Sequence, residues 1–91
     1  MDYPFLTIPM AIIEDERLNN AQMILYGIIL STLEEQPYCK LKNRDLSRIM
    51  KTSESSILIH LDALERCGHI DRTIIRRETT NEVIERRIYL L

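Results

Sequence analysis

Basic side chains gather in two stretches of the sequence and are its clearest candidates for chemistry. The first stretch, residues 40–51, contains Lys40, Lys42, Arg44, Arg48 and Lys51. The second stretch, residues 72–87, contains Arg72, Arg76, Arg77, Arg86 and Arg87. Guanidinium and ammonium groups bind phosphate oxygens through charge-assisted hydrogen bonds. Such contacts give affinity for a polyanion and fix its position, but they carry little sequence information.

The charge distribution supports a basic side of the molecule more than the total charge does. The formal net charge is only −2, which argues mildly against a nucleic-acid partner. Residues 1–35 carry six acids against Arg17 alone, whereas residues 36–91 carry eleven of the twelve basic residues against eight acids. This asymmetry predicts a polarised surface; the alternative is a set of solvated faces with mixed charge.

Catalysis, metal binding and membrane insertion find little support in the residue types. His60 and His69 have no serine and carboxylate spaced to form a nucleophilic site, and Cys67 with His69 has the wrong spacing for a usual zinc site. Only two glycines are present, so no glycine-rich phosphate loop exists. The apolar run Met23–Leu30 is too short to span a bilayer. We therefore expect a cytoplasmic, non-enzymatic protein with no cofactor, no metal, no membrane contact and free reduced thiols at Cys39 and Cys67.

The first third of the chain predicts a packed N-terminal segment and one buried helix. In residues 1–18, Pro9 can occupy the first position of a short helical turn, and apolar residues can lay the segment across the body: Phe5, Ile8, Ile12 and Leu18. A helix over residues 19–36 then follows, with Asn19 or Asn20 as N-cap and Pro37 after its end. Its apolar band is wide, which is typical of a central, largely buried helix.

Residues 43–68 read as a helix-turn-helix. Asn43 can cap a short helix whose apolar positions are Leu46, Ile49 and Met50, and Lys51 with Thr52 makes the turn. Ser53 is the expected N-cap of the second helix, which runs to Cys67 and ends at Gly68, a residue suited to a left-handed conformation. The apolar stripe of this helix is Ile57, Leu61 and Leu64. A short extended piece, residues 38–42, precedes the motif.

After Gly68 the apolar period changes from 3.6 to 2, which predicts a β-hairpin over residues 69–91 with its turn at residues 79–82. Pairing Ile74 with Ile88 places apolar residues on one face, namely Ile70, Ile74, Ile84, Ile88 and Leu90, and pairs Arg77 with Glu85 on the other. The same register puts Arg72, Arg76 and Arg86 on the apolar face, which is awkward, and a bulge would shift it.

The order helix, short strand, helix, turn, helix, hairpin is that of a winged helix. The fold class expected is mainly α with a C-terminal β-hairpin (α+β), as one winged helix-turn-helix domain over residues 1–91. The sequence also resembles the winged-helix domain at the N-terminus of plasmid and phage replication initiators, and related small phage helix-turn-helix proteins. The resemblance lies in "FLTIP" followed by "EDERL", in "QMILYGIILS", in "LSRIMKTSESSILIHLDALERCGHIDR" and in "RRIYLL".

The resemblance implies binding to double-stranded DNA, with the second helix of the motif in the major groove and the hairpin as a wing on the backbone or minor groove. It implies a bacterial or phage-encoded protein acting in replication initiation or its regulation. It places Ser53, Glu54, Ser55 and Ser56 at the start of the recognition helix. Members of the family commonly carry basic or polar residues where this chain has Glu54, Ser55, Leu58 and Ile59.

The recognition helix contains no Lys or Arg from Thr52 to Glu65, so we expect the cations to come from elsewhere. Ile59 projects away from the apolar stripe and Leu58 lies on its flank; both can contact thymine methyl groups, bind a protein partner or second copy, or be covered. Arg76, Arg77 and Arg86 are expected near the wing tip, where pairing with Glu78, Glu82 and Glu85 is the alternative to phosphate contact. The predicted DNA-binding set is Arg44, Arg48, Ser55, Ser56, Ile59, Arg72, Arg76, Arg77 and Arg86. The predicted protein-interaction pair is Leu58 and Ile59, for a homodimer or a replication or regulatory partner.

Overall fold

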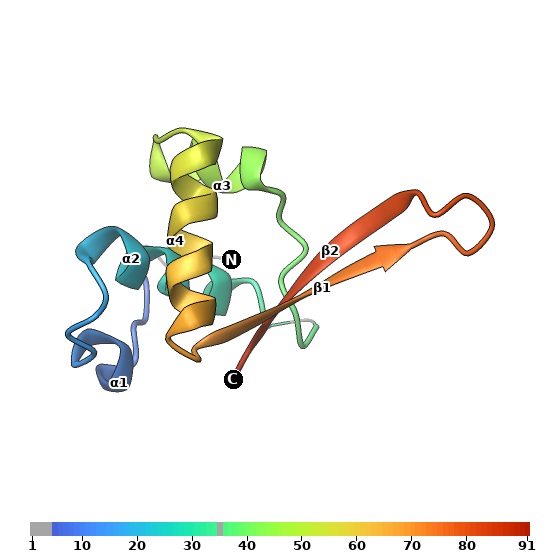
Figure 1. Cartoon of the computed structure of the whole chain (residues 1–91). Coiled ribbons are helices and arrows are strands. Elements are labelled where there is room, and N and C mark those ends of the chain that lie inside the picture. The colour runs from blue at the N-terminus through green and yellow to red at the C-terminus, as the bar shows by residue number, and fades with distance from the viewer. Residues whose placement is uncertain (1–4, 35) are drawn as a thin grey trace.

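The computed structural model describes residues 5–34 and 36–91 and shows four helices followed by a two-stranded antiparallel hairpin (Figure 1). The elements are α1 Met10–Ile13, α2 Asn20–Ser31, α3 Asn43–Met50, α4 Glu54–Arg66, β1 Ile70–Arg76 and β2 Val83–Leu90. The predicted fold class is confirmed: the chain is an α+β winged helix in which α3 and α4 form the helix-turn-helix and the hairpin forms the wing.

The N-terminal segment packs across α2. Pro9 is the N-cap of α1, so it lies one position before the first helical residue, Met10, and not at the first helical position as predicted. Gly27 of α2 allows a close approach, because a Cβ built on it would lie 3.0 Å from Ile8 Cγ1. Ile12 and Leu18 are buried as predicted, whereas Phe5 is 64% exposed. This segment therefore packs on α2 through residues on both sides of Pro9, with Ile8 before it and Ile12 after it.

Helix α2 begins where the sequence predicts but ends earlier. Asn19 and Gln22 form a reciprocal capping box, in which each side-chain oxygen accepts from the other residue's backbone N–H. The predicted extension to residue 36 is wrong, because the helix ends at Ser31. The Ser31 and Thr32 hydroxyls donate to carbonyl oxygens three residues back, at 2.6 and 2.7 Å. Such bonds satisfy carbonyl groups locally and favour termination of the helix.

The helix-turn-helix is closed by local caps. Lys42, not Asn43, is the N-cap of α3, and its backbone N–H donates to the Asp45 carboxylate at 3.0 Å. Lys51 ends α3 in a left-handed conformation, with φ of 55°. Ser53 caps α4 as predicted, and its hydroxyl accepts from the Ser56 N–H. Gly68 has φ of +81°, which confirms the predicted left-handed stop after α4.

The hairpin register differs from the predicted one by two residues. Ile74 lies opposite Arg86, and Ile88 lies opposite Arg72, so the predicted pairs of Ile74 with Ile88 and of Arg77 with Glu85 are wrong. The pairing is irregular between Ile75 and Arg76, and the sequence analysis had named a bulge as a reason for a shifted register without giving its position. Ile70 and Ile88 are buried, but Ile74 and Ile84 are 46% and 53% exposed, since the hairpin extends beyond the body (Figure 1).

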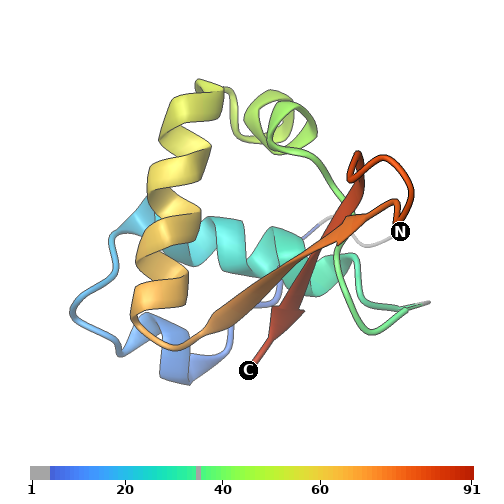
Figure 2. The same ribbon diagram turned by 45° about the vertical axis from the view of Figure 1, so that its right-hand side comes forward.

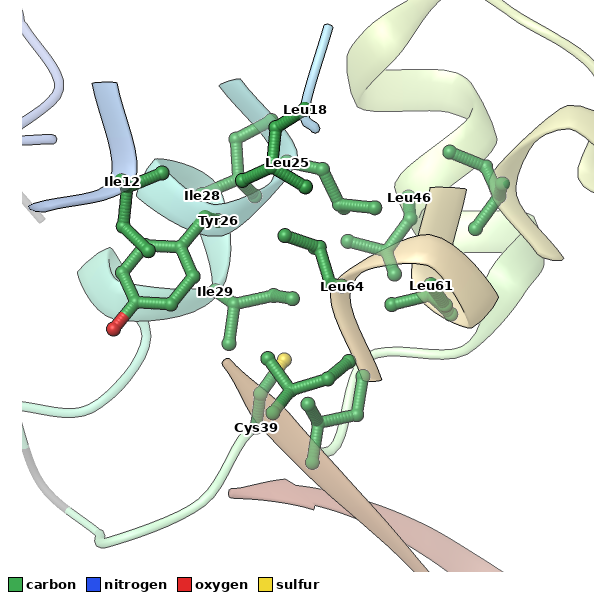
Figure 3. Packing of buried hydrophobic residues seen from close by; sticks show 13 residues of the cluster. Ile12, Leu18, Leu25, Tyr26, Ile28, Ile29, Cys39, Leu46, Leu61 and Leu64 are labelled. Carbon is green, nitrogen blue, oxygen red and sulfur yellow. The ribbon is translucent and has the colours of Figure 1, made fainter. Parts of the chain in front are cut away.

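The core lies between α2, α4, α3 and the base of the hairpin. Figure 3 shows side chains of α2, α3 and α4 converging, with Cys39 below them beside the strands. Cys39 is fully buried, and its backbone exchanges two hydrogen bonds with Ile88, at 2.9 and 3.0 Å. The predicted extended piece over residues 38–42 thus joins the wing at its base. Cys39 and Cys67 are free cysteines.

The turn between α1 and α2 is fastened to the point where α4 passes into β1. The Asp15 carboxylate accepts from His69 Nε2 at 2.6 Å and from the Arg17 guanidinium at 2.8 Å. Arg17 also donates to the Cys67 carbonyl oxygen at 3.4 Å. Hydrogen bonds from Arg17, and secondarily from His69, hold the pKa of the Asp15 carboxyl well below its usual range. This cluster connects the start of the chain to the base of the wing.

Candidate nucleic-acid interface

Helix α4 presents an apolar and acidic outer face. It crosses in front of α2, with α3 at its N-terminal end and the hairpin leaving from its C-terminal end (Figures 1 and 2). Ile57, Leu61 and Leu64 are buried, as predicted for the inner stripe. Away from this stripe, Leu58 on its flank is 47% exposed and Ile59 on the opposite side is 62% exposed. The alternative that neighbouring elements cover these two residues is therefore wrong.

The serines at the start of α4 form a small hydroxyl cluster. Ser53 Oγ lies 3.1 Å from Ser55 Oγ and 2.9 Å from Ser56 Oγ, besides accepting from the Ser56 N–H. Ser55 is exposed and Ser56 is partly buried. Capping thus uses part of the hydrogen-bonding capacity of Ser55 and Ser56, the two serines predicted to contact DNA.

Arg72 of β1 is the counter-ion of the acidic residues on α4. Its guanidinium bonds Asp62 Oδ1 at 2.6 Å and the Glu65 carboxylate at 3.1 and 3.2 Å. The Arg72 side chain is only 18% exposed. The hydrogen bonds from Arg72 lower the pKa of Glu65, and the bond to Glu65 is the main cause of the raised Arg72 pKa. The predicted DNA-binding residue Arg72 is therefore already engaged inside the molecule.

The sequence predicted Arg86 near the wing tip, and this prediction is wrong. Arg86 lies against the start of α3. Its guanidinium donates to the Asn43 side-chain oxygen and, at 2.6 Å, to the Leu41 carbonyl oxygen. Its Nε is buried without a hydrogen-bond partner among the described residues. Burial lowers the Arg86 pKa. No carboxylate among the described residues forms an ion pair with this guanidinium. Arg86 joins the wing to the helix-turn-helix.

Arg76 and Arg77 do occupy the end of the wing, as predicted. Arg76 donates to the Asn81 carbonyl oxygen at 3.2 Å, which leaves most of its guanidinium directed to solvent. Arg77 Nε lies 3.8 Å from a Glu82 oxygen, and the two side chains are 58% and 69% exposed. An exposed ion pair of this length contributes little and is easily exchanged for another anion. The wing tip therefore offers two accessible cations.

Arg44 and Arg48 project from α3 on the side away from its core residue Leu46. The two arginines are four residues apart and exposed, so they lie one above the other on the helix surface. Within the described residues, no hydrogen bond or ion pair engages either guanidinium. Together with Arg76 and Arg77 they form the cationic set, defined here as the four exposed arginines of α3 and the wing tip.

A further cluster on the opposite face of the hairpin was missed by the sequence reasoning. The Arg87 guanidinium lies 4.4 Å from the centre of the Tyr38 ring and bonds Glu85, which lowers the pKa of the Glu85 carboxyl. Tyr89 packs beside Tyr38 with ring centres 5.6 Å apart. The sequence signal was the alternation of Glu85, Arg87 and Tyr89 on one face of β2. Because Arg87 is already held by an acid and a ring, it contributes to the wing's own packing.

Neither a metal-ligand cluster nor a membrane-spanning helix is present among the described residues. Nowhere in residues 5–34 and 36–91 do three His, Cys, Asp or Glu side chains group as ligands for an ion. Over the same residues, no helix is both long enough and apolar enough to cross a bilayer.

Comparison with known proteins gives similarity of fold alone. A solved structure described as "N-Terminal domain of DNA binding protein" superposes with a TM-score of 0.71 at 22% identity, covering 96% of this chain and 73% of that one. A second, described as "Structure of Rep-DNA complex", gives a TM-score of 0.69 at 22% identity, covering 96% of this chain and 74% of that one. No protein-family model matches the sequence. No curated protein matches it either. The resemblance to winged-helix N-terminal domains is thus confirmed for the fold.

Proposed function

We propose that this chain is a DNA-binding winged-helix protein whose partner is double-stranded DNA. The observation that carries the proposal is the placement of the cationic set on both sides of α4. Arg44 and Arg48 project from α3 at one end of α4, and Arg76 and Arg77 lie on the wing that leaves its other end. In a winged helix these two flanks meet the phosphates on either side of the groove that the recognition helix enters. The solved structures of similar fold support the same assignment.

The cations divide into two roles in this proposal. The cationic set supplies the phosphate contacts, because its guanidinium groups are exposed. Arg72 and Arg86 hold the wing against the helix-turn-helix through their contacts with α4 and the start of α3. The net charge of −2 does not oppose the proposal, since screening limits each charge to its surroundings within about 8 Å at physiological salt.

A salt titration tests this function. Fluorescence anisotropy with a labelled duplex should show binding that weakens as salt rises, with a slope that counts phosphate contacts. Replacing Arg77 with alanine should lower that slope by about one and weaken binding to all duplexes alike. Asn20→Asp on α2 changes the net charge by the same amount and should leave the slope unchanged. Undetectable duplex binding at about 50 mM salt, where phosphate contacts are strongest, overturns the proposal.

The finer role we infer is action in replication initiation or its control, by a phage- or plasmid-type cytoplasmic protein without enzymatic activity, with residues 1–91 acting as one domain. The resemblance in the phrases "QMILYGIILS" and "RRIYLL" supports this context. DNA cross-linked to the protein in its source cells should map to a replication origin. Recovery of promoter fragments without origin sequences would move the role to transcription control.

The second candidate function is protein interaction through α4. It is favoured by Leu58 and Ile59, two neighbouring aliphatic residues that are 47% and 62% exposed. Apolar residues grouped on a surface are typical of protein contacts. If these residues form a dimer or partner interface, Ile59→Glu should abolish the complex, while Ile24→Glu on the exposed side of α2 should not. Light scattering that gives the same mass for the wild type and the Ile59 variant counts against a dimer.

A further inference from the structure

We propose that α4 reads thymine 5-methyl groups in the major groove, so that the bases beneath it are predominantly A·T pairs. The inference rests on the proposed function and deepens it by naming the bases that the site accepts. It follows from the chemistry left available on the outer face of α4 after the contacts inside the molecule are counted.

Guanine readout lacks its usual bidentate donors on the part of α4 that meets the bases. Guanine presents two acceptors in the major groove, and its usual partners are Arg and Lys. Between Glu54 and Glu65 the helix contains neither residue. Arg66 lies in the last turn, whereas a recognition helix contacts base edges with its N-terminal residues. A guanine under the first turns of α4 would therefore lose hydrogen bonds to water without an arginine or lysine to replace both of them.

Cytosine readout is also disfavoured. The cytosine amino group is a donor that Asp or Glu accepts from. Asp62 is the acid on the outer face of α4, and its carboxylate is bonded by Arg72 at 2.6 Å. Glu54 lies in the first turn of the helix, where the positive end of the helix dipole stabilises its negative charge. A contact between Asp62 and a cytosine would therefore compete with the bond that Arg72 already makes to this carboxylate.

The aliphatic side chains remain, and thymine is the base that matches them. The thymine methyl is an apolar group exposed in the major groove. Ile59 and Leu58 are adjacent, exposed and on the outer side of α4. The cationic set lies on the two elements that flank α4 in the fold, α3 and the wing, and its charges fit phosphates. The major groove of an A·T duplex presents thymine methyl groups between two phosphate backbones. An apolar helix face with cationic elements beside it complements this surface more closely than it complements a protein surface.

The test uses duplexes that differ only in the methyl group. One labelled duplex contains A·T pairs, and its counterpart carries deoxyuridine in place of every thymidine. A second pair compares a G·C duplex with the same duplex carrying 5-methylcytosine, which places a methyl at the equivalent position of the groove. The full chain should bind the thymidine duplex about fourfold more tightly for each methyl contacted, the value expected for burying one methylene-sized group. The 5-methylcytosine duplex should likewise bind more tightly than the unmethylated one.

Two variants assign the preference to α4. Ile59→Ala should bring the ratio of the two affinities towards one, because it should weaken binding to the thymidine duplex more than binding to the deoxyuridine duplex. Ile24→Ala, at a similarly exposed aliphatic residue on α2, should keep the full ratio. Both positions are exposed, and circular dichroism should show that each variant keeps the helical content of the wild type.

The outcomes separate this inference from the proposed function. Equal affinity for the thymidine and deoxyuridine duplexes overturns the methyl readout and leaves DNA binding intact. A ratio that survives both Ile59→Ala and Leu58→Ala also overturns it, because the methyl effect then arises from duplex shape. Failure to bind any of the duplexes at low salt overturns the proposed function itself.

Discussion

Arg72 can either bind a phosphate or neutralise the carboxylates of Asp62 and Glu65 on α4. A single substitution of Arg72 removes both roles at once. Its low exposure and its bonds to Asp62 and Glu65 favour neutralisation. Arg72→Ala should then weaken duplex binding by roughly fivefold, because about 1 kcal/mol of like-charge repulsion between carboxylate and phosphate is no longer offset. Anisotropy titrations at a fixed salt concentration measure this change.

The discriminating measurement repeats the substitution in an acid-free background. In Asp62→Asn, Glu65→Gln protein, removal of Arg72 should have almost no further effect on affinity, since its role depends on those carboxylates. An equal loss of affinity in both backgrounds would show that Arg72 contacts DNA directly, as the sequence first indicated. Thermal unfolding of the four proteins checks that the wing remains attached.

Asp15 is a second residue whose environment gives a testable consequence, here for stability. Its pKa lies well below the usual range because Arg17 and His69 donate hydrogen bonds to the charged form. A depressed pKa in the folded state means that the carboxylate stabilises the fold above about pH 4, the ordinary Asp pKa, and that this contribution is lost as the pH falls below it. Asp15→Asn should therefore lower the free energy of unfolding at pH 7, with a difference that shrinks below pH 4.

Urea denaturation at a series of pH values checks this expectation. Asp71→Asn provides the control, since Asp71 is exposed on β1 and makes no ion pair with another described residue. A deficit of the Asp15 variant that stays constant from pH 7 to about pH 3 would contradict the linkage argument.

At the scale of the element, the end of α4 depends on one backbone conformation. Gly68 has φ of +81°, and a Cβ placed on it would meet no atom within 4 Å. The cost of Gly68→Ala is therefore conformational and not steric, and it should lower the free energy of unfolding by about 1 kcal/mol. Gly68→Asn should cost less, because asparagine tolerates the left-handed region better. Equal stability of all three proteins in urea unfolding would refute this.

The elements that the sequence predicted well are those with local signals. Both limits of α4 follow from residues that act on their own backbone, Ser53 by capping and Gly68 by its conformation. The end of α2 was missed, because Ser31 and Thr32 end the helix through bonds that an apolar pattern does not register. The hairpin register was missed by two residues because such a shift leaves every side chain on its original face, so alternation cannot distinguish the two pairings.

The candidate site was predicted less completely than the fold, because side-chain partners depend on tertiary geometry. The exposure of Ile59 and the tip position of Arg77 follow from helical and strand periodicity. The bonds of Arg86 to Leu41 and Asn43 join residues more than 40 positions apart, which no local pattern reveals. The pairing of Arg72 had a signal that was overlooked, since Asp62 and Glu65 stand three residues apart on one side of α4.

At the scale of the whole molecule, the wing is held at its base and projects at its tip. The longest dimension is 44 Å against 30 and 25 Å, and Figure 1 shows the hairpin extending away from the helices. Three contacts fix the base: the exchange of hydrogen bonds between Cys39 and Ile88, the ion pairs of Arg72, and the bonds of Arg86. The tip, with Arg76 and Arg77, has only contacts within the hairpin. The base contacts therefore fix the direction of the wing, and Arg76 and Arg77 stay exposed at its tip.

Hydrogen exchange should reveal this gradient along the wing. The Ile88 and Cys39 amides and the Arg77 and Asn81 amides all make hydrogen bonds of 2.8 to 3.0 Å, so bond length does not distinguish them. Cys39 and Ile88 are fully buried, whereas Arg77 and Asn81 are exposed, so the first pair should exchange only when the core opens and the second by local fraying. Protection factors corrected for intrinsic rates should differ by about a hundredfold or more. Adding duplex DNA should slow the tip amides and leave the base amides unchanged. Equal protection of base and tip in the free protein would show that the wing opens as one unit with the core.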